Sequence, residues 1–234
     1  MAYVLGYLYA DGNLEYSPRI RGRYIRVTST DKDRITSIRK LLKSKHSIVV
    51  DKRDGNYKDK YLLRIGNCAL YNQLAKFGVT PHKSLTMCLP SIPIRFTGDF
   101  VRGYFDGDGC VYYEQGRGKT SLIKKRLAVI FTSGSKTFLH QLNILLSQRA
   151  GTSIRTIYSY ARNAHRLRYS TADSKILFPF IYKNAKRKEL YLSRKYAIFY
   201  KYLRGKDGHV AKIETRRSAK PLCAGAHPAV ASSI

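Results

Sequence analysis

Hydrophobic residues recur along the chain with two periods, which predict where helices and strands lie. In residues 35–42 and 139–146, apolar positions follow the i, i+3, i+6, i+7 spacing of a helix with one buried face. Other segments alternate apolar and polar residues, as expected for strands with one buried and one open face. Strands are predicted at residues 14–19, 23–28, 48–53, 60–65, 111–115, 127–132, 154–160 and 166–170.

The second half of the chain repeats the first. Val4–Gly12 and Val101–Gly109 share Val, Gly, Tyr, Asp and Gly at matching positions. Segments 27–32 and 131–136 also correspond, and each precedes one of the two helical patterns. Each half therefore reads as helix, two strands, helix, two strands, helix, with the closing helices near 70–77 and 176–182.

This order predicts an α+β fold built from two pseudo-symmetric αββαββα halves. We place the halves at residues 1–90 and 97–204, joined by a linker at 91–96, because residues 80–93 contain three prolines that disfavour regular structure. Residues 205–234 are rich in Gly, Ala, Ser, Pro and Lys and show no periodic apolar face. We expect them to form a flexible basic tail.

The charge of the chain points to a polyanionic partner. Its 44 Lys and Arg exceed its 15 Asp and Glu by a net +29, far more than solubility requires. Nineteen Tyr, nine Phe and 44% hydrophobic residues supply a folded core, so a disordered basic segment is excluded. The basic surface is therefore displayed on a scaffold.

Cysteine and histidine spacing gives no zinc pattern. The four cysteines form no C-x-x-C pair, and the six histidines are scattered. No apolar run reaches the length of a membrane span, and no basic segment precedes an apolar one at the N-terminus. We expect an intracellular, soluble protein with no membrane contact; the compartment is not distinguished.

The repeated motif favours close packing of two helices. Gly6 and Ala10, like Gly103 and Gly107, are four residues apart, which places each pair on one face of a helix. Small side chains on that face let another backbone approach closely. The two motif helices are therefore expected to pack against each other.

A carboxylate ends each motif helix. Asp11 and Asp108 are followed by Gly12 and Gly109, which suit the left-handed position that terminates a helix. Free carbonyls and the negative end of the helix dipole favour cations there. Two such ends side by side predict one divalent-metal centre with oxygen ligands suited to Mg²⁺.

The strand pattern also predicts an open, arginine-rich sheet face. Alternation places apolar residues towards the helices and arginines on the opposite side. Arginines can donate to phosphates or bidentately to guanine edges, and a twisted antiparallel sheet can follow a DNA groove. The open face is a candidate nucleic-acid surface.

With these features, the chain resembles the single-chain, two-motif LAGLIDADG homing endonucleases. The resemblance covers roughly residues 1–203 and rests on both motifs, the Thr-Ser elements after them and the segment 78–85. It implies a saddle of two antiparallel sheets astride double-stranded DNA, with the motif helices at the seam. It also implies metal-dependent hydrolysis of both strands across the minor groove, leaving short 3′ overhangs.

The resemblance assigns the metal-binding and catalytic acids to Asp11 and Asp108. The carbonyls of Ala10 and Gly107 are implied as further metal ligands. Mg²⁺ is the implied cofactor; Mn²⁺ is expected to substitute, and Ca²⁺ to bind without supporting cleavage. Tyr9 departs from the family pattern, because many members carry an acid at that position.

A basic residue before the last helix of each half is also implied to be catalytic. Lys83 matches it in the first half. In the second half Lys188 matches, although Lys186 and Arg187 compete within the same cluster. These side chains would stabilise charge at the phosphate or orient water.

Two further sets of residues follow from the resemblance. Ser29 with Lys32, and Ser133 with Lys136, hold the places where the family orders water around the scissile phosphate. The expected DNA contacts are Arg19, Arg26, Thr28, Arg64, Tyr112, Glu114, Arg126, Thr132, Arg155, Arg166 and Arg168.

The sequence thus predicts a monomeric, site-specific DNA endonuclease with an asymmetric target, because the two halves differ in sequence. Two alternatives stay open on the same fold: a DNA-binding regulator without catalysis, and a maturase that binds intron RNA. Retention of both Asp11 and Asp108 favours the enzyme, since a regulator could lose them.

Overall fold

The computed structural model describes residues 1–55, 57–81, 83–117, 123–183, 185 and 190–204; at residues 20, 115–117 and 123–125 it describes the backbone alone. The tail expected at 205–234 and the candidate Lys188 lie outside these residues.

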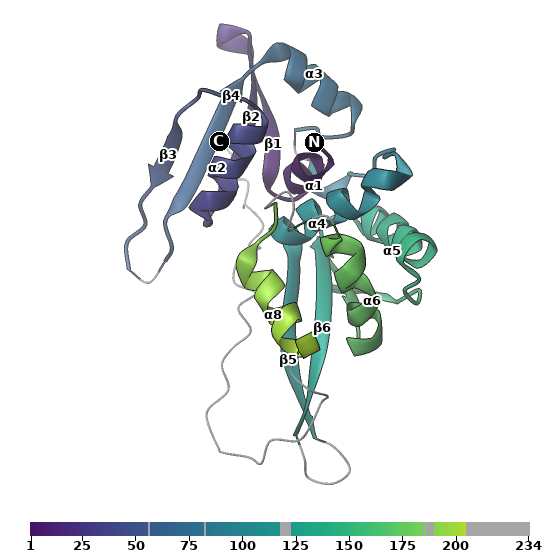
Figure 1. Cartoon of the computed structure of the whole chain (residues 1–234). Helices are drawn as coiled ribbons and strands as arrows, with labels where there is room; N and C mark the ends of the chain where they lie inside the picture. Colours follow the sequence, from purple (N-terminus) through teal and green to yellow (C-terminus); the bar gives the residue numbers. More distant parts are fainter. Residues whose placement is uncertain (56, 82, 118–122, 184, 186–189, 205–234) are drawn as a thin grey trace.

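In the first half, helices and strands follow the predicted αββαββα order (Figure 1). The elements are α1 (Ala2–Asp11), β1 (Gly12–Ser17), β2 (Gly22–Ser29), α2 (Lys32–Leu41), β3 (Ile48–Asp51), β4 (Lys60–Gly66) and α3 (Cys68–Lys76). Asn67 caps α3 by accepting a hydrogen bond from the Leu70 amide at 2.9 Å, which starts this helix directly after β4.

The second half repeats this order and, among its described residues, continues into helix α8. The elements are α4 (Thr97–Asp108), β5 (Gly109–Arg117), β6 (Ile123–Ser133), α5 (Lys136–Ala150), β7 (Ile157–Ala161), β8 (Ala164–Tyr169), α6 (Thr171–Tyr182) and α8 (Ser193–Arg204). Ser135 caps α5 by accepting from the Phe138 amide at 3.2 Å, and Gly151 ends it with a φ of 83°. The additional helix α8 was not predicted from the sequence.

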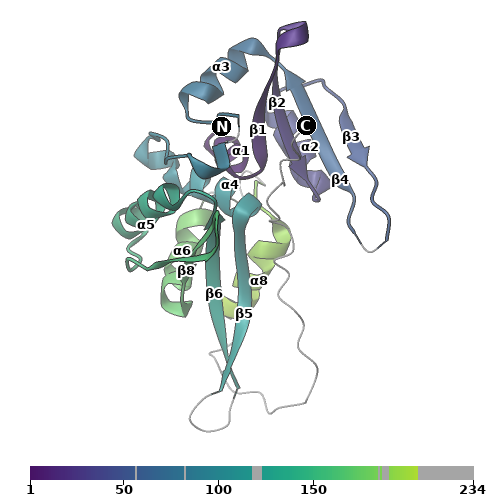
Figure 2. The same cartoon turned by 180° about the vertical axis from the view of Figure 1, so that it is seen from behind.

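Each half carries one four-stranded antiparallel sheet. The strand orders are β1-β2-β4-β3 and β5-β6-β8-β7, so the first strand of each half lies at an edge. Helices α2 and α3 contact the first sheet and α5 and α6 the second, while α8 contacts β5. As Figure 2 shows from behind, α1 and α4 lie between the two sheets.

The predicted alternation is confirmed by burial. The apolar strand residues assigned to the helix side are all buried, namely Ile25, Val27, Leu63, Ile65, Leu127, Val129, Phe131, Leu167 and Tyr169. On the opposite side, Arg26 pairs in register with Arg64 and Thr132 with Arg166. All three arginines are exposed, so one face of each sheet is left open to a partner.

Some strands end earlier than predicted, among them β3, which stops at Asp51 and not at residue 53, and β1. β1 stops at Ser17, because Pro18 begins the short 3-10 helix η1 (Pro18–Ile20), and a proline cannot donate to a strand ladder. Arg19 therefore lies in η1 and not in the sheet. No helix in the described ranges is both long and apolar enough to cross a membrane.

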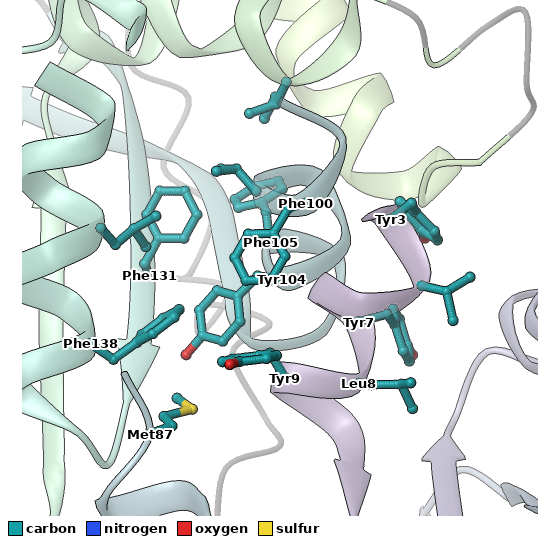
Figure 3. Packing of buried hydrophobic residues seen from close by; sticks show 14 of the residues in the cluster. Tyr3, Tyr7, Leu8, Tyr9, Met87, Phe100, Tyr104, Phe105, Phe131 and Phe138 are labelled. Carbon is teal, nitrogen blue, oxygen red and sulfur yellow. The ribbon is translucent and has the colours of Figure 1, made fainter. Parts of the chain in front are cut away.

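An aromatic core joins the two halves at α1 and α4. The Tyr9 ring lies 5.3 Å from Phe100 and 6.0 Å from Phe138, measured between centroids. Tyr104 and Phe138 are 4.6 Å apart (Figure 3). Tyr9 of the first motif thus packs into the second half, and burial of these rings stabilises the seam.

Candidate active site at the seam of two motif helices

The small residues of the two motifs bring α1 and α4 into backbone contact, as predicted. A Cβ added to Gly6 would overlap the Phe100 carbonyl oxygen, and one added to Gly103 would overlap the Tyr3 carbonyl oxygen. The clash is reciprocal, as expected for a pseudo-twofold pair. At the far end of the helices, a Cβ on Gly107 would lie 3.2 Å from the Asp11 Oδ2 atom.

The two motif carboxylates therefore lie at the same end of the seam. Asp11 is the last residue of α1 and Asp108 the last residue of α4. Burial and the charge of Asp11 raise the pKa of Asp108 to about 7, against the opposing charges of Lys83 and Lys195. Burial also raises the pKa of Asp11, opposed by a hydrogen bond from Tyr7 and by both lysines. Mutual repulsion makes the pair a favourable place for a cation.

The expected left-handed conformation of the glycines after the motifs is wrong. Gly12 has φ −95° and Gly109 φ −89°, both extended. Glycine is required there for a different reason: a Cβ would lie 2.6 Å from the Leu8 oxygen at Gly12, and 2.5 Å from the Phe105 oxygen at Gly109. The chain turns directly from helix into strand against the last helical turn.

One buried lysine contacts the end of each motif. Lys83 donates through Nζ to the Gly12 carbonyl oxygen. Lys195 donates to the carbonyl oxygens of Phe105 at 2.6 Å, Asp106 at 2.9 Å and Gly109 at 2.5 Å. Gly12 and Gly109 are matching motif positions, so the two lysines are structural counterparts.

The second-half lysine in this place is therefore Lys195, which the sequence did not single out. Lys195 lies in α8, whereas the predicted Lys188 falls outside the described residues. Burial lowers the pKa of Lys195 to about 8 and also lowers that of Lys83. Among the described residues of the first half no α-helix matches α8, since Lys83 lies in the short 3-10 helix η2 (Lys83–Leu85), so the repeat offset gave no signal for Lys195.

The two predicted serines lie next to motif tyrosines. The Tyr7 and Ser29 hydroxyl oxygens lie 2.9 Å apart and share one hydrogen bond, and the charge of Asp11 helps burial to raise the pKa of Tyr7. Tyr104 is a hydrogen-bond partner of Ser133, and the charge of Asp108 contributes to the raised pKa of Tyr104. In each half a tyrosine thus connects the serine to the side of the motif carboxylate.

Lys32 and Lys136 begin α2 and α5, immediately beyond these serines. Both side chains are exposed. Their predicted role in ordering water stays a prediction.

The donor set fits a hard divalent ion. In the described part of the chain, no group of three or more His, Cys, Asp or Glu side chains gathers as a metal site. A metal would therefore rely on the Asp11 and Asp108 carboxylates completed by carbonyls, for which Ala10 and Gly107 are the candidates, and by water. Such oxygen ligation with open positions is what Mg²⁺ prefers.

The acid that Tyr9 replaces has a structural role in the other motif. Asp106 is buried, accepts hydrogen bonds from the Tyr3 hydroxyl at 2.8 Å and the Leu192 amide at 2.9 Å, and has its pKa raised by burial to about 6. In the first motif, the Tyr9 hydroxyl instead donates to the Phe77 carbonyl. Each side chain thus anchors a segment near the end of its own half.

The expected DNA contacts divide into two groups. The structure pairs the Arg155 guanidinium with Asp173 of α6, at 2.5 and 2.8 Å, on the helix side of the sheet. Arg155 is thus engaged in an ion pair outside the strands, and its predicted DNA contact stays a prediction. Arg19 lies in η1, after β1. The other expected contacts lie on the strands of the two sheets, namely Arg26, Thr28, Arg64, Tyr112, Glu114, Arg126, Thr132, Arg166 and Arg168.

Comparison with solved structures finds DNA-bound nucleases of similar fold. Meganuclease I-SmaMI bound to uncleavable DNA matches with a TM-score of 0.55 and 14% identity, over 86% of this chain and 88% of that one. The homing endonuclease I-WcaI bound to its DNA recognition sequence matches with a TM-score of 0.57 and 11% identity, over 85% and 84%. A variant of I-SmaMI with two lysine-to-alanine substitutions gives 0.54 and 12%, over 86% and 88%.

At identities of 11–14%, these solved structures show a shared fold; the family of the chain follows from its sequence. No curated protein matches the sequence. The family model described as LAGLIDADG-like domain matches residues 1–78 and 96–201, which include both motifs. The chain belongs to the family of LAGLIDADG-like domain proteins.

Proposed function

We propose that this protein is a monomeric, site-specific endonuclease that hydrolyses both strands of double-stranded DNA with a divalent metal ion. The observation that carries the proposal is the convergence of Asp11 and Asp108, each with a buried lysine, at one end of the seam between two arginine-lined sheets. The relatives support it: I-SmaMI and I-WcaI are bound to DNA, and I-SmaMI has an uncleaved target in the presence of calcium ions.

The residues at the seam supply what phosphodiester hydrolysis needs. Mg²⁺ held by Asp11 and Asp108 would neutralise phosphate charge and activate water; Mn²⁺ is expected to substitute, and Ca²⁺ to bind without cleavage. Lys83 and Lys195 would stabilise the negative charge that grows on the phosphate. Cleavage on both strands would leave short 3′ overhangs.

We further propose that each half reads one part of an asymmetric target. In this division, residues 1–90 and 97–204 are the two DNA-binding halves and 91–96 the linker. Glu15 and Tyr112 are matching positions of the repeat, as are Ser17 and Glu114, so the two open faces present different side chains.

The test is selection of cleaved sequences from a randomised DNA library with Mg²⁺. We expect the wild type to cut a defined sequence, and Asp11→Asn or Asp108→Asn to lower the cleavage rate by on the order of 10²–10³-fold while DNA binding is kept. Lys83→Met and Lys195→Met should each lower it by at least about 10-fold. Asp54→Asn, in an exposed loop, is the matched control.

Two results would contradict the proposal. Sequence-specific binding without any cleavage by the wild type, in Mg²⁺ or Mn²⁺, would favour the regulator. Stronger binding to structured RNA than to any duplex DNA would favour the maturase.

A further inference from the structure

Each open sheet face carries a glutamate, although the chain has few acids and faces a polyanion. Glu15 lies on β1 and Glu114 on β5, in a protein with 15 acidic and 44 basic residues. A carboxylate on a DNA-binding face repels phosphates, so it opposes binding that depends on backbone contacts alone. Its presence calls for a role other than charge attraction.

In the first half, Glu15 holds two arginines. Its Oε2 atom accepts a hydrogen bond from Arg64 Nε at 3.0 Å, and its Oε1 atom accepts one from Arg26 Nη1 at 3.2 Å. The Arg64 guanidinium also lies 3.8 Å from the centroid of the Tyr24 ring. Arg64 is thus fixed at its edge by a carboxylate and at its face by an aromatic ring.

This arrangement leaves the useful end of Arg64 free. Within the described residues, Glu15 is the hydrogen-bond acceptor recorded for this guanidinium, and it takes the Nε atom only. The side chain of Arg64 is 47% exposed, so its two terminal nitrogens can donate to a ligand. That planar fork matches the O6 and N7 acceptors of guanine in the major groove.

The second half repeats the arginine but not the acid. Arg168 corresponds to Arg64 in the repeat, and it donates to Glu114 through the terminal nitrogen Nη2, whereas Arg64 uses Nε. Glu114 also accepts from the Tyr112 hydroxyl at 3.0 Å. The repeat counterpart of Glu15 is Tyr112, and Glu114 stands two residues farther along its strand. Two acids at different positions therefore restrain equivalent arginines, so an acid–arginine pair recurs on each open face.

We propose that Arg64 and Arg168 each read a guanine, at equivalent positions of the two half-sites, and that Glu15 and Glu114 are positioning residues that hold these guanidinium groups for base contact. The proposal rests on the proposed DNA-cleaving function. It deepens that function by naming the two residues that set one base of each half-site. An arginine fixed before binding loses little freedom when it contacts a base, and the adjacent carboxylate disfavours a swing to phosphate.

The experiment is selection of bound sequences from a randomised duplex library by the full chain. The parent is the Asp11→Asn/Asp108→Asn double variant, so that bound DNA is not cut. We expect a strong guanine preference at one position of each half-site, of about 5- to 150-fold, as for one bidentate base contact. Arg64→Lys, which keeps the charge but removes the fork, should flatten that preference in one half-site only, and Arg168→Lys in the other.

The role of Glu15 has its own readout. Glu15→Gln should lower the guanine preference several-fold at the Arg64 position while strengthening binding to mismatched DNA, because a repulsive charge is gone. Combined with Arg64→Lys it should cause no further loss of preference, as expected for residues that act together. Arg149→Ala, on the exposed end of α5, is the control and should leave the selected sequence unchanged.

Three contrary results would each overturn a different part of the proposal. If Arg64→Lys weakens binding to all sequences equally, the residue contacts phosphate and base reading is overturned. If Glu15→Gln keeps the full preference that Arg64→Lys abolishes, the positioning role is overturned. If the parent selects no sequence at all, site-specific DNA recognition fails, and with it the proposed function.

Discussion

Asp11 and Asp108 bring two negative charges to one end of a tightly packed helix pair. Without a cation, burial and mutual repulsion favour their protonated forms, which is why the pKa of Asp108 is raised to about 7. A divalent ion reverses that preference. The site is therefore expected to be destabilising when empty and ionised, and stabilising when metal is bound.

A comparison of unfolding free energies with and without the Asp108 carboxylate tests this. A carboxyl whose pKa is higher in the folded than in the unfolded protein stabilises the fold at low pH, and this contribution is lost as pH rises through the folded value. In EDTA, the wild type should lose stability between pH 5 and 8 by on the order of 3 kcal/mol more than Asp108→Asn. Urea unfolding at both pH values measures the difference.

Adding Mg²⁺ at pH 8 should then stabilise the wild type more than the variant. Parallel pH profiles of the two proteins would show that the carboxylate is not strained in the fold.

The acids were predictable from the sequence, and the second lysine was not. Asp11 and Asp108 end two similar motifs, so the repeat itself identifies them. Lys195 contacts the second motif from α8. Its position is fixed by hydrogen bonds to three backbone carbonyls, those of Phe105, Asp106 and Gly109. No local pattern around Lys195 records those distant carbonyls.

At the scale of elements, the helix pair α1–α4 depends on the absence of side chains. Backbone meets backbone at Gly6 and Gly103, so there is no flexible group that could move aside for an added methyl. The same contact fixes the relative position of the two carboxylates at the ends of the helices. Stability and the placement of the two carboxylates are thus coupled at these glycines.

Gly103→Ala should consequently destabilise the protein by at least about 3 kcal/mol, at the upper end of the cost of overpacking. Gly66→Ala is the control, because its Cβ would meet side chains and no backbone: the Tyr24 ring at 3.3 Å and His46 Nε2 at 3.9 Å. Thermal unfolding of both variants measures the effect. Equal melting temperatures for Gly103→Ala and the control would mean that the seam can open at little cost.

Most elements were predictable because their residues repeat with a clear period. The buried side was correct for the four strands to which the sequence analysis assigned one, β2, β4, β6 and β8, since one face of each sheet packs on helices and the other stays open. The backbone conformation of Gly12 and Gly109 could not be predicted, because a left-handed turn and a crowded extended turn both select glycine. The sequence records which residue fits, and only the packing against Leu8 and Phe105 shows why.

At the scale of the whole molecule, DNA affinity depends on the positive charge on the open faces of the two sheets. Arg26, Arg126 and Arg166 are exposed on the open sides of the sheets, where they can neutralise phosphates. Each phosphate contact releases counterions, so the affinity for DNA must fall as salt rises.

The logarithm of the association constant should fall linearly with the logarithm of salt concentration, by about 0.9 per neutralised phosphate. Arg126→Ala should reduce the magnitude of this slope by about 1 without changing the preferred sequence. Arg149→Ala on α5 should leave it unchanged. Fluorescence anisotropy with labelled duplex at several salt concentrations provides the values, and a nearly flat dependence for the wild type would contradict groove binding by the sheets.

The glycine contacts between α1 and α4 have a consequence for how such proteins can be recombined. An interface made of main-chain atoms depends on the shape of the partner helix and little on its side chains. A hybrid that joins one half to the half of a relative therefore first needs glycines at matching positions of the two helices. Other links across this junction are particular to the chain. The ion pair from Arg194 to Asp31, at 3.2 Å, and the hydrogen bond from Tyr3 to Asp106 would have to be supplied anew in every chimera.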